Sequence, residues 1–119
     1  MGLTYVTVEI TPVNKKTGYN AVFLVDTGAT DSLVPGKELE KIGIEREGTM
    51  TYELADGTKK EYDFGFAAIR FMGDATAGRV LFGNDQDEPL LGVTALGSVG
   101  ILVDPVNRTL KRLPAIPLK

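Results

Sequence analysis

Residues 49 to 71 alternate between polar and apolar side chains on both sides of Ala55-Asp56-Gly57. A period of two puts neighbouring side chains on opposite faces of a β-strand, and it does not produce one apolar face on a helix. Asp-Gly between two such segments favours a β-hairpin with a type I′ turn, in which both central residues have positive φ. We therefore expect two strands joined at residues 55–57, in a chain that folds mainly as β-sheet.

The remaining sequence is also dominated by short apolar or alternating segments. They predict strands at 6–10, 19–25, 32–34, 79–82, 90–91, 101–103 and 109–113, and short helices between Pro35 and Gly43 and between residues 93 and 97. The nearly continuous apolar run at 19–25 is typical of a strand covered on both faces. No internal repeat is visible, and 119 residues are enough for one core. The prediction is a single all-β domain over residues 1–119.

The chain contains neither histidine nor cysteine. Ser-His and Cys-His catalysis and zinc sites built from imidazole or thiolate are therefore excluded, and proton transfer has to come from Asp, Glu, Tyr or Lys. The net charge of −3 gives no broad basic face for nucleic acid or an anionic membrane, and no apolar run is long enough to span a bilayer. We expect no metal, no cofactor, no nucleic-acid partner, no membrane association and a cytoplasmic location.

The apolar run at 19–25 ends in Asp26-Thr27-Gly28. A buried strand holds the carboxylate of Asp26 rigidly in surroundings that penalise its charge, and Gly28 lets a substrate or another backbone approach closely. Two carboxylates that share a proton act as general base and general acid, and they titrate in two macroscopic steps. The sequence has one such triplet, so the second carboxylate would come from another copy of the chain. A simple turn after a strand is the alternative for so short a motif.

Three features follow one another along the chain. They are Phe23-Leu24-Val25-Asp26-Thr27-Gly28-Ala29-Thr30, the hairpin tipped by Ala55-Asp56-Gly57, and Leu90-Leu91-Gly92 before a short helix. From about residue 4 to about residue 113, the chain resembles the retropepsin-like family of aspartic proteases, which includes the retroviral proteases and stand-alone bacterial and archaeal relatives. The resemblance implies the acid protease fold, a closed β-barrel with a flap hairpin and one or two short helices. It also implies a homodimer that cleaves peptide or protein substrates.

By this resemblance, Asp26 would be the catalytic carboxylate and would form a dyad with Asp26 of the second copy. Thr27 would bond across the dimer to the other active-site loop, and Gly28 would border the substrate. The hairpin around residues 50–62 would be a flap that closes over an extended peptide. Leu90-Leu91-Gly92 would cross behind the active-site loop and hold it. The residues expected to contact the substrate are Ala29, Thr30, Asp31, Ala55, Asp56 and Gly57.

Two departures from the retroviral pattern change what the resemblance implies. Retroviral members have a paired Asp and Arg where this chain has Thr30 and Val93. The loss of both partners is self-consistent, because the loss of one would leave an unpaired buried charge, and Asp31 remains available to accept a peptide N–H. Pro114 and Pro117 cannot donate to a central ladder. We therefore expect a terminal dimer interface that is shorter than the retroviral one or built differently.

Several other residues have two interpretations. Leu102-Val103-Asp104 echoes the segment that ends at Asp26, but Pro105 follows it, so Asp104 is expected to begin a turn rather than to complete an internal dyad. Tyr52 is either a cross-strand aromatic or reaches the active site through its hydroxyl. Six apolar residues either line subsites or belong to the core: Leu33, Val34, Ile44, Leu54, Ile69 and Leu96.

The leading hypothesis for function is a homodimeric aspartic endopeptidase. The alternative is a protease-like module that binds peptides or mediates dimerisation with little or no catalysis. A purely structural β domain is a third interpretation, in which the Asp-Thr-Gly segment is only a turn. A glycosidase with two carboxylates fits less well, because the chain has no Trp to form a sugar platform.

Overall fold

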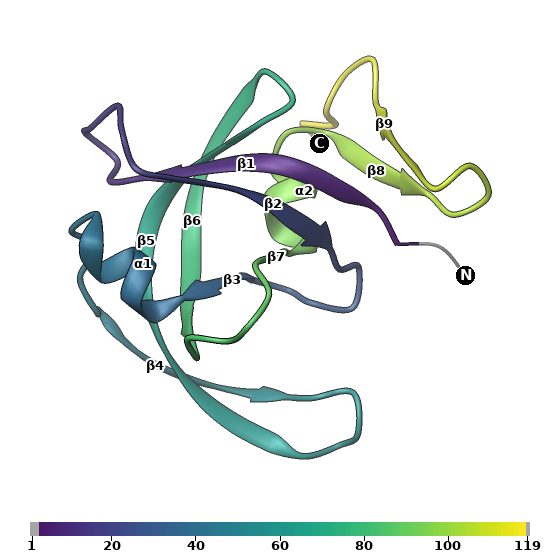
Figure 1. Cartoon of the computed structure of the whole chain (residues 1–119). Helices are drawn as coiled ribbons and strands as arrows, with labels where there is room; N and C mark the ends of the chain where they lie inside the picture. The colour runs from purple at the N-terminus through teal and green to yellow at the C-terminus, as the bar shows by residue number, and fades with distance from the viewer. Residues whose placement is uncertain (1–2, 119) are drawn as a thin grey trace.

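The computed structural model describes residues 3–118, which form an almost entirely β structure with two short helices (Figure 1). The strands are β1 (Tyr5–Thr11), β2 (Tyr19–Val25), β3 (Ser32–Pro35), β4 (Gly48–Glu53), β5 (Lys59–Phe71), β6 (Asp74–Gly83), β7 (Leu90–Leu91), β8 (Ile101–Asp104) and β9 (Thr109–Arg112), and the helices are α1 (Gly36–Lys41) and α2 (Val93–Ser98). The expected all-β class is confirmed. Neither helix of the described chain has the length and apolar character needed to cross a bilayer. Residues 1, 2 and 119 of the expected domain lie outside the described residues.

The pairing of the strands forms a closed ring. Its order is β1-β2-β7-β3-β6-β5, and β5 pairs back to β1, where Ile69 lies opposite Ile10. Within the ring β2–β7 and β3–β6 are parallel, and the other pairs are antiparallel. Among the described strands, β4 pairs with β5 alone, so the β4–β5 hairpin extends away from the ring (Figure 1). Closure pairs both edges of most strands and leaves this hairpin as a projecting arm.

The apolar core fills the ring. Val8 and Ile10 alternate with polar residues along β1 and are fully buried, and Phe23 of β2 is the largest of the fully buried side chains. The prediction that β2 is covered on both faces is wrong for its first half, since Val22 is 56% exposed. A strand in a closed ring has one inward and one outward face, and Val22 lies on the outward face.

The tip of the β4–β5 hairpin differs from the expected two-residue turn. The amide of Leu54 donates to the carbonyl of Thr58 at 2.7 Å, and the amide of Gly57 donates to the carbonyl of Leu54 at 2.9 Å. Gly57 has a φ of 88°, whereas Asp56 is not among the described residues with positive φ. The loop therefore contains residues 55–57 and places a single glycine in the left-handed region, which follows the strand twist without straining Asp56.

The β5–β6 hairpin is longer than the strand expected at residues 79–82. Strand β6 begins at Asp74, directly after Met72 and Gly73, whose φ angles are 54° and 80°. Two positive φ angles are the requirement of a type I′ loop, and pairing of Phe71 with Asp74 closes it. Gly73 is a usual residue for such a turn, but methionine rarely adopts positive φ, so the sequence did not identify a two-residue loop at this point.

Strands β8 and β9 form a separate two-stranded sheet. Asp104 begins the turn between them, because its carboxylate accepts N–H groups from the backbone of Asn107 at 3.2 Å, the side chain of Asn107 at 2.9 Å and the backbone of Val106 at 2.9 Å. The hydrogen bonds from Asn107, followed by the one from Val106, lower the pKa of Asp104. The predicted turn at Asp104 is confirmed, and both of its carboxylate oxygens are engaged within the turn.

Candidate active site

Asp26 follows the last residue of β2 and is held from behind by β7. Val25 lies opposite Leu91 in the parallel pair, and the amide of Asp26 donates to the carbonyl of Leu91 at 3.0 Å. Leu91 is fully buried, whereas Asp26 is only half-buried. The core strand therefore delivers the carboxylate to the surface at a defined position.

A tight turn orients the carboxylate of Asp26. The amide of Ala29 donates to the carbonyl of Asp26 at 3.1 Å, and the amide of Gly28 donates to its side-chain Oδ1 at 2.9 Å. A Cβ at Gly28 would lie 3.3 Å from the same Oδ1. Thr27, which lies between Asp26 and Gly28 in the sequence, is exposed. One carboxylate oxygen is thus anchored to the backbone, and Thr27 lies at the surface of the protomer.

The start of α2 supports the loop from the other side. The amide of Val93 donates to the carbonyl of Ala29 at 2.9 Å, and the amide of Thr94 donates to the carbonyl of Thr30 at 3.2 Å. Thr30 and Val93, which take part in these bonds, stand where the retroviral pattern has a charged pair. Backbone hydrogen bonds between the same two segments hold the loop here, without a charged side chain at residue 30 or residue 93.

Gly92 packs directly against the loop backbone. Its amide donates to the hydroxyl of Ser32 at 3.1 Å, and a Cβ at this position would lie 2.6 Å from the carbonyl carbon of Asp31 and 2.8 Å from the carbonyl oxygen of Thr30. The clashing atoms are backbone, so a side chain at residue 92 has to displace the active-site loop itself. The crossing of residues 90–92 behind this loop requires glycine at that contact.

Gly92→Ala is expected to lower the free energy of unfolding by about 1–3 kcal/mol, the usual cost of inserting a methyl group into a packed site. Gly97→Ala is the matched control, because a Cβ at Gly97 of α2 meets no atom within 4 Å and alanine is favoured over glycine in a helix by up to about 1 kcal/mol. Urea unfolding followed by circular dichroism measures both. Equal stability of Gly92→Ala and the unsubstituted protein would contradict the close packing.

A cleft of about 550 Å³ lies between the loop at residues 26–31 and the β4–β5 hairpin. It is lined by Asp26, Gly28, Ala29, Thr30, Asp31, Leu33, Thr51, Tyr52, Glu53, Leu54, Ala55, Tyr62, Leu81 and Leu90. The loop and the hairpin, which are far apart in the sequence, thus form opposite walls of one hollow. Of the residues expected to contact a substrate, Ala29, Thr30, Asp31 and Ala55 line this cleft.

The hairpin tip lies beyond the cleft lining. Asp56 and Gly57 are exposed and are not among the lining residues. The carboxylate of Asp56 accepts the hydroxyl of Thr58 at 2.6 Å and its amide at 3.0 Å, and these bonds lower the pKa of Asp56. The geometry explains Asp56 and Gly57 as turn residues.

The structure distinguishes cleft residues from core residues among the apolar side chains that had two interpretations. Leu33 and Leu54 line the cleft, whereas the other four are buried in the core: Val34, Ile44, Ile69 and Leu96. Tyr52 is a cross-strand aromatic residue that also lines the cleft. Its ring packs edge-on against Tyr62 across the hairpin with centroids 6.0 Å apart, and its hydroxyl donates to Oδ2 of Asp31 at 2.5 Å.

Arg79 of β6 joins the same group, with its Nη1 3.5 Å from Oδ2 of Asp31. Partial burial, followed by the hydrogen bond to Asp31, raises the pKa of Tyr52. The sequence placed Arg79 only at the start of a short strand. The one available clue was a cation within an apolar segment, which does not identify a partner.

A second groove, of about 720 Å³, begins at the other side of Asp26. Its lining consists of Leu3, Thr4, Leu24, Val25, Asp26, Thr27, Val103, Asp104, Pro105, Val106 and Arg108. Leu3 is 64% and Val106 84% exposed, so the groove has apolar side chains at its rim. Asp26 is the ionisable residue common to this groove and the cleft.

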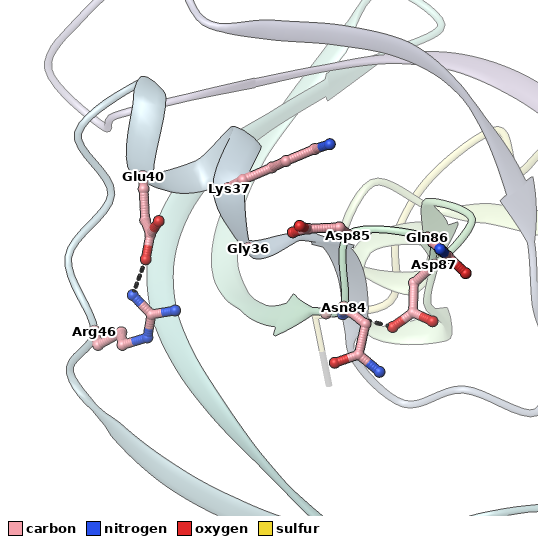
Figure 2. Close-up of a pocket in the computed structure, with 9 residues that line it drawn as sticks. Gly36, Lys37, Glu40, Arg46, Asn84, Asp85, Gln86 and Asp87 are labelled. Carbon is pink, nitrogen blue, oxygen red and sulfur yellow. Dashed lines mark hydrogen bonds and ion pairs between the residues drawn. The ribbon is translucent and has the colours of Figure 1, made fainter.

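A third hollow, shown in Figure 2, lies away from Asp26 between α1 and the loop after β6. Arg46 points toward Glu40 there and forms an ion pair with it (Figure 2). The same guanidinium pairs with Asp63 at 2.9 Å and stacks on the ring of Phe82 at 4.2 Å. The charges of this region therefore tie α1 to the root of the β4–β5 hairpin. Within the described residues, no group of three or more acidic side chains is arranged to hold a metal ion.

The comparisons with known proteins agree with this geometry. A family model described as "gag-polyprotein putative aspartyl protease" matches residues 13–98. The solution structure of the simian foamy virus (mac) protease has a TM-score of 0.56 and 25% sequence identity, over 78% of this chain and 91% of the viral chain. The foamy viral protease-reverse transcriptase, solved in complex with an RNA/DNA hybrid, has a TM-score of 0.59 and 18% identity, over 79% of this chain and 11% of that chain.

At 18% identity, the match to the foamy viral protease-reverse transcriptase supports the fold alone. The search of curated proteins finds no match. The family model spans most of the chain, including the Asp-Thr-Gly turn, the β4–β5 hairpin and β7. The chain has the fold of the retroviral proteases and belongs to the gag-polyprotein aspartyl protease family.

Proposed function

We propose that the protein is an aspartic endopeptidase whose active site contains Asp26 from two copies of the chain. The observation that carries this proposal is the position of Asp26 at the junction of two hollows. On one side is the cleft beneath the β4–β5 hairpin, and on the other is the exposed groove with apolar residues at its rim. We assign the first hollow to a peptide and the second to another copy of the chain.

The chemistry needs one charged and one protonated carboxylate. The charged one accepts a proton from water, whose oxygen attacks the peptide carbonyl carbon, while the other gives its proton to the carbonyl oxygen. Transfer of a proton to the amide nitrogen then allows the C–N bond to break, which yields a carboxyl and an amino terminus. The amide of Gly28 holds Oδ1 of Asp26 and fixes the orientation of the carboxylate that would share the proton with its partner.

The β4–β5 hairpin is the proposed flap. An extended peptide in the cleft would pair its backbone with the hairpin and with the segment that follows Gly28, as in strand addition. The apolar lining residues Leu33, Leu81 and Leu90 favour an apolar side chain in at least one subsite. Peptide or protein is the proposed substrate class, and a cytoplasmic location without nucleic-acid partners remains our prediction.

The proposed dimer surface is the groove beside Asp26. Thr27 is exposed at its edge, so its hydroxyl is available to a second copy of the loop. The terminal strands β8 and β9 pair with each other within the protomer. We therefore propose that a dimer brings together two preformed hairpins.

Kinetics at varied pH and protein concentration test the proposal. We expect a bell-shaped, mildly acidic pH–rate profile, because activity requires one of the two carboxylates to be protonated and the other charged. Specific activity should rise with protein concentration as dimers form. The alternative, a peptide-binding or dimerisation module, is favoured by a measurable peptide affinity without any turnover across this range.

A further inference from the structure

Asp31 is an acidic residue of the cleft whose side chain is largely enclosed. Its side chain is 10% exposed, and it lines the cleft directly beyond the active-site turn. Tyr52 contacts its Oδ2 from the hairpin side at 2.5 Å, and Arg79 approaches the same oxygen at 3.5 Å. Two elements that are remote in the sequence thus converge on one carboxylate oxygen.

Arg79 approaches from behind the cleft wall. It lines a small hollow of about 40 Å³ on that side, together with Thr76 and Ser98, and is not among the residues that line the cleft. Its guanidinium stacks over the ring of Phe64 at 4.6 Å, and its Nε is buried without a hydrogen-bond partner in the described structure. The cation is therefore held in place by packing and supplies a positive charge behind Asp31.

We propose that Tyr52 and Arg79 neutralise Asp31 within the cleft wall, and that this compensation makes the neighbouring subsite select an uncharged substrate side chain. The inference rests on the proposed function of the cleft. A partly buried carboxylate that already has a cation and a hydroxyl on one oxygen attracts a second cation weakly. The surrounding Leu33, Leu81 and Leu90 add an apolar lining that penalises a charged group.

The test removes the compensation and measures the preference for lysine. Peptides of otherwise apolar sequence carry lysine or norleucine at each position in turn, because these side chains have similar length and differ in charge. In Arg79→Gln, Asp31 keeps the hydroxyl of Tyr52 but loses its cation. The lysine-to-norleucine ratio in kcat/KM is therefore expected to rise about tenfold at one position. The double variant Arg79→Gln/Asp31→Asn should return the ratio to that of the unsubstituted protein.

Two further variants make the result specific. Tyr52→Phe keeps the aromatic contact with Tyr62 and removes the hydroxyl, so it should shift the ratio in the same direction by a smaller factor of about two to three. Arg70→Gln removes a cation of β5 that bonds Thr11 outside the cleft and should leave the ratio unchanged. Glu53 also lines the cleft, but it is present in every variant and cancels in the comparison.

Affinities of the same peptides for the Asp26→Asn protein separate this inference from the proposed function. Peptide binding without turnover in the unsubstituted protein would refute the endopeptidase, while the ratio of affinities would still test Asp31. An unchanged ratio in both folded Arg79→Gln and Tyr52→Phe, or a preference for lysine in the unsubstituted protein, would overturn the inference. If Arg79→Gln does not fold, Tyr52→Phe decides the question. A protein that binds none of the peptides would overturn both proposals.

Discussion

Asp26→Asn is expected to abolish peptide cleavage, with kcat/KM lower by at least about a thousandfold. General acid–base catalysis by a positioned side chain contributes about a hundredfold to ten-thousandfold, and a symmetric dimer loses both carboxylates at once. The amide oxygen of asparagine can still accept the hydrogen bond from Gly28, so the turn should keep its shape. Hydrolysis of a fluorogenic peptide measures activity, and thermal unfolding checks that stability is retained.

Asp85→Asn is the matched control for this change. Asp85 is an exposed residue of the loop after β6 and does not line the cleft, so activity should be unchanged. Mixed dimers provide a sharper test of the shared dyad. If equal amounts of active and Asp26→Asn chains exchange freely, about one quarter of the dimers keep both carboxylates, and activity should fall to that fraction. Retention of one half would mean that each protomer works with its own Asp26.

Val106→Asp is expected to prevent dimer formation and, with it, activity at low protein concentration. Val106 is 84% exposed at the turn between β8 and β9, and it lines the groove that begins at Asp26. Its replacement leaves the core of the protomer untouched, but it puts an unpaired charge into the proposed interface, which costs several kcal/mol on association. The dimer dissociation constant should therefore rise at least about a hundredfold.

Sedimentation velocity and peptide hydrolysis over the same concentration range measure this effect. Val13→Asp is the control, because Val13 is 62% exposed between β1 and β2 and does not line the groove. It should leave the mass and the activity of the protein unchanged. A Val106→Asp protein that remains fully active as a monomer would refute a site built from two copies.

The part of the fold that the sequence predicts best is its local geometry. The period-two pattern around residues 55–57 identified the β4–β5 hairpin, and Asp104 before Pro105 identified the turn of the last hairpin. Prediction failed where an unusual residue took a special conformation, as Met72 does with its φ of 54°. It failed at Val22 because an apolar side chain on the outward face of a ring cannot be distinguished from a buried one by its type.

The sequence likewise predicted one part of the candidate site and missed another. Asp26-Thr27-Gly28 was identified from the sequence because a strand, a carboxylate and a glycine are consecutive there, and the chain has no histidine or cysteine to suggest other chemistry. Leu33 and Val34 show the limit of this approach, since β3 is buried along its whole length. The first lines the cleft and the second lies in the core.

The sequence by itself determined that this protein is mainly β-sheet and that one Asp-Thr-Gly triplet follows an apolar strand. The alternation of apolar and polar residues and the preferences of turn residues act over a few positions, so they can be recognised in the amino-acid sequence. Only the tertiary structure decided that Tyr52 and Arg79 meet on Asp31, and that Asp26 lies between a cleft and an exposed groove. The pairing of β3 with β6 places Arg79 beside Asp31, and the β4–β5 hairpin carries Tyr52 to the same carboxylate. No local pattern relates these residues, because they are far apart in the sequence.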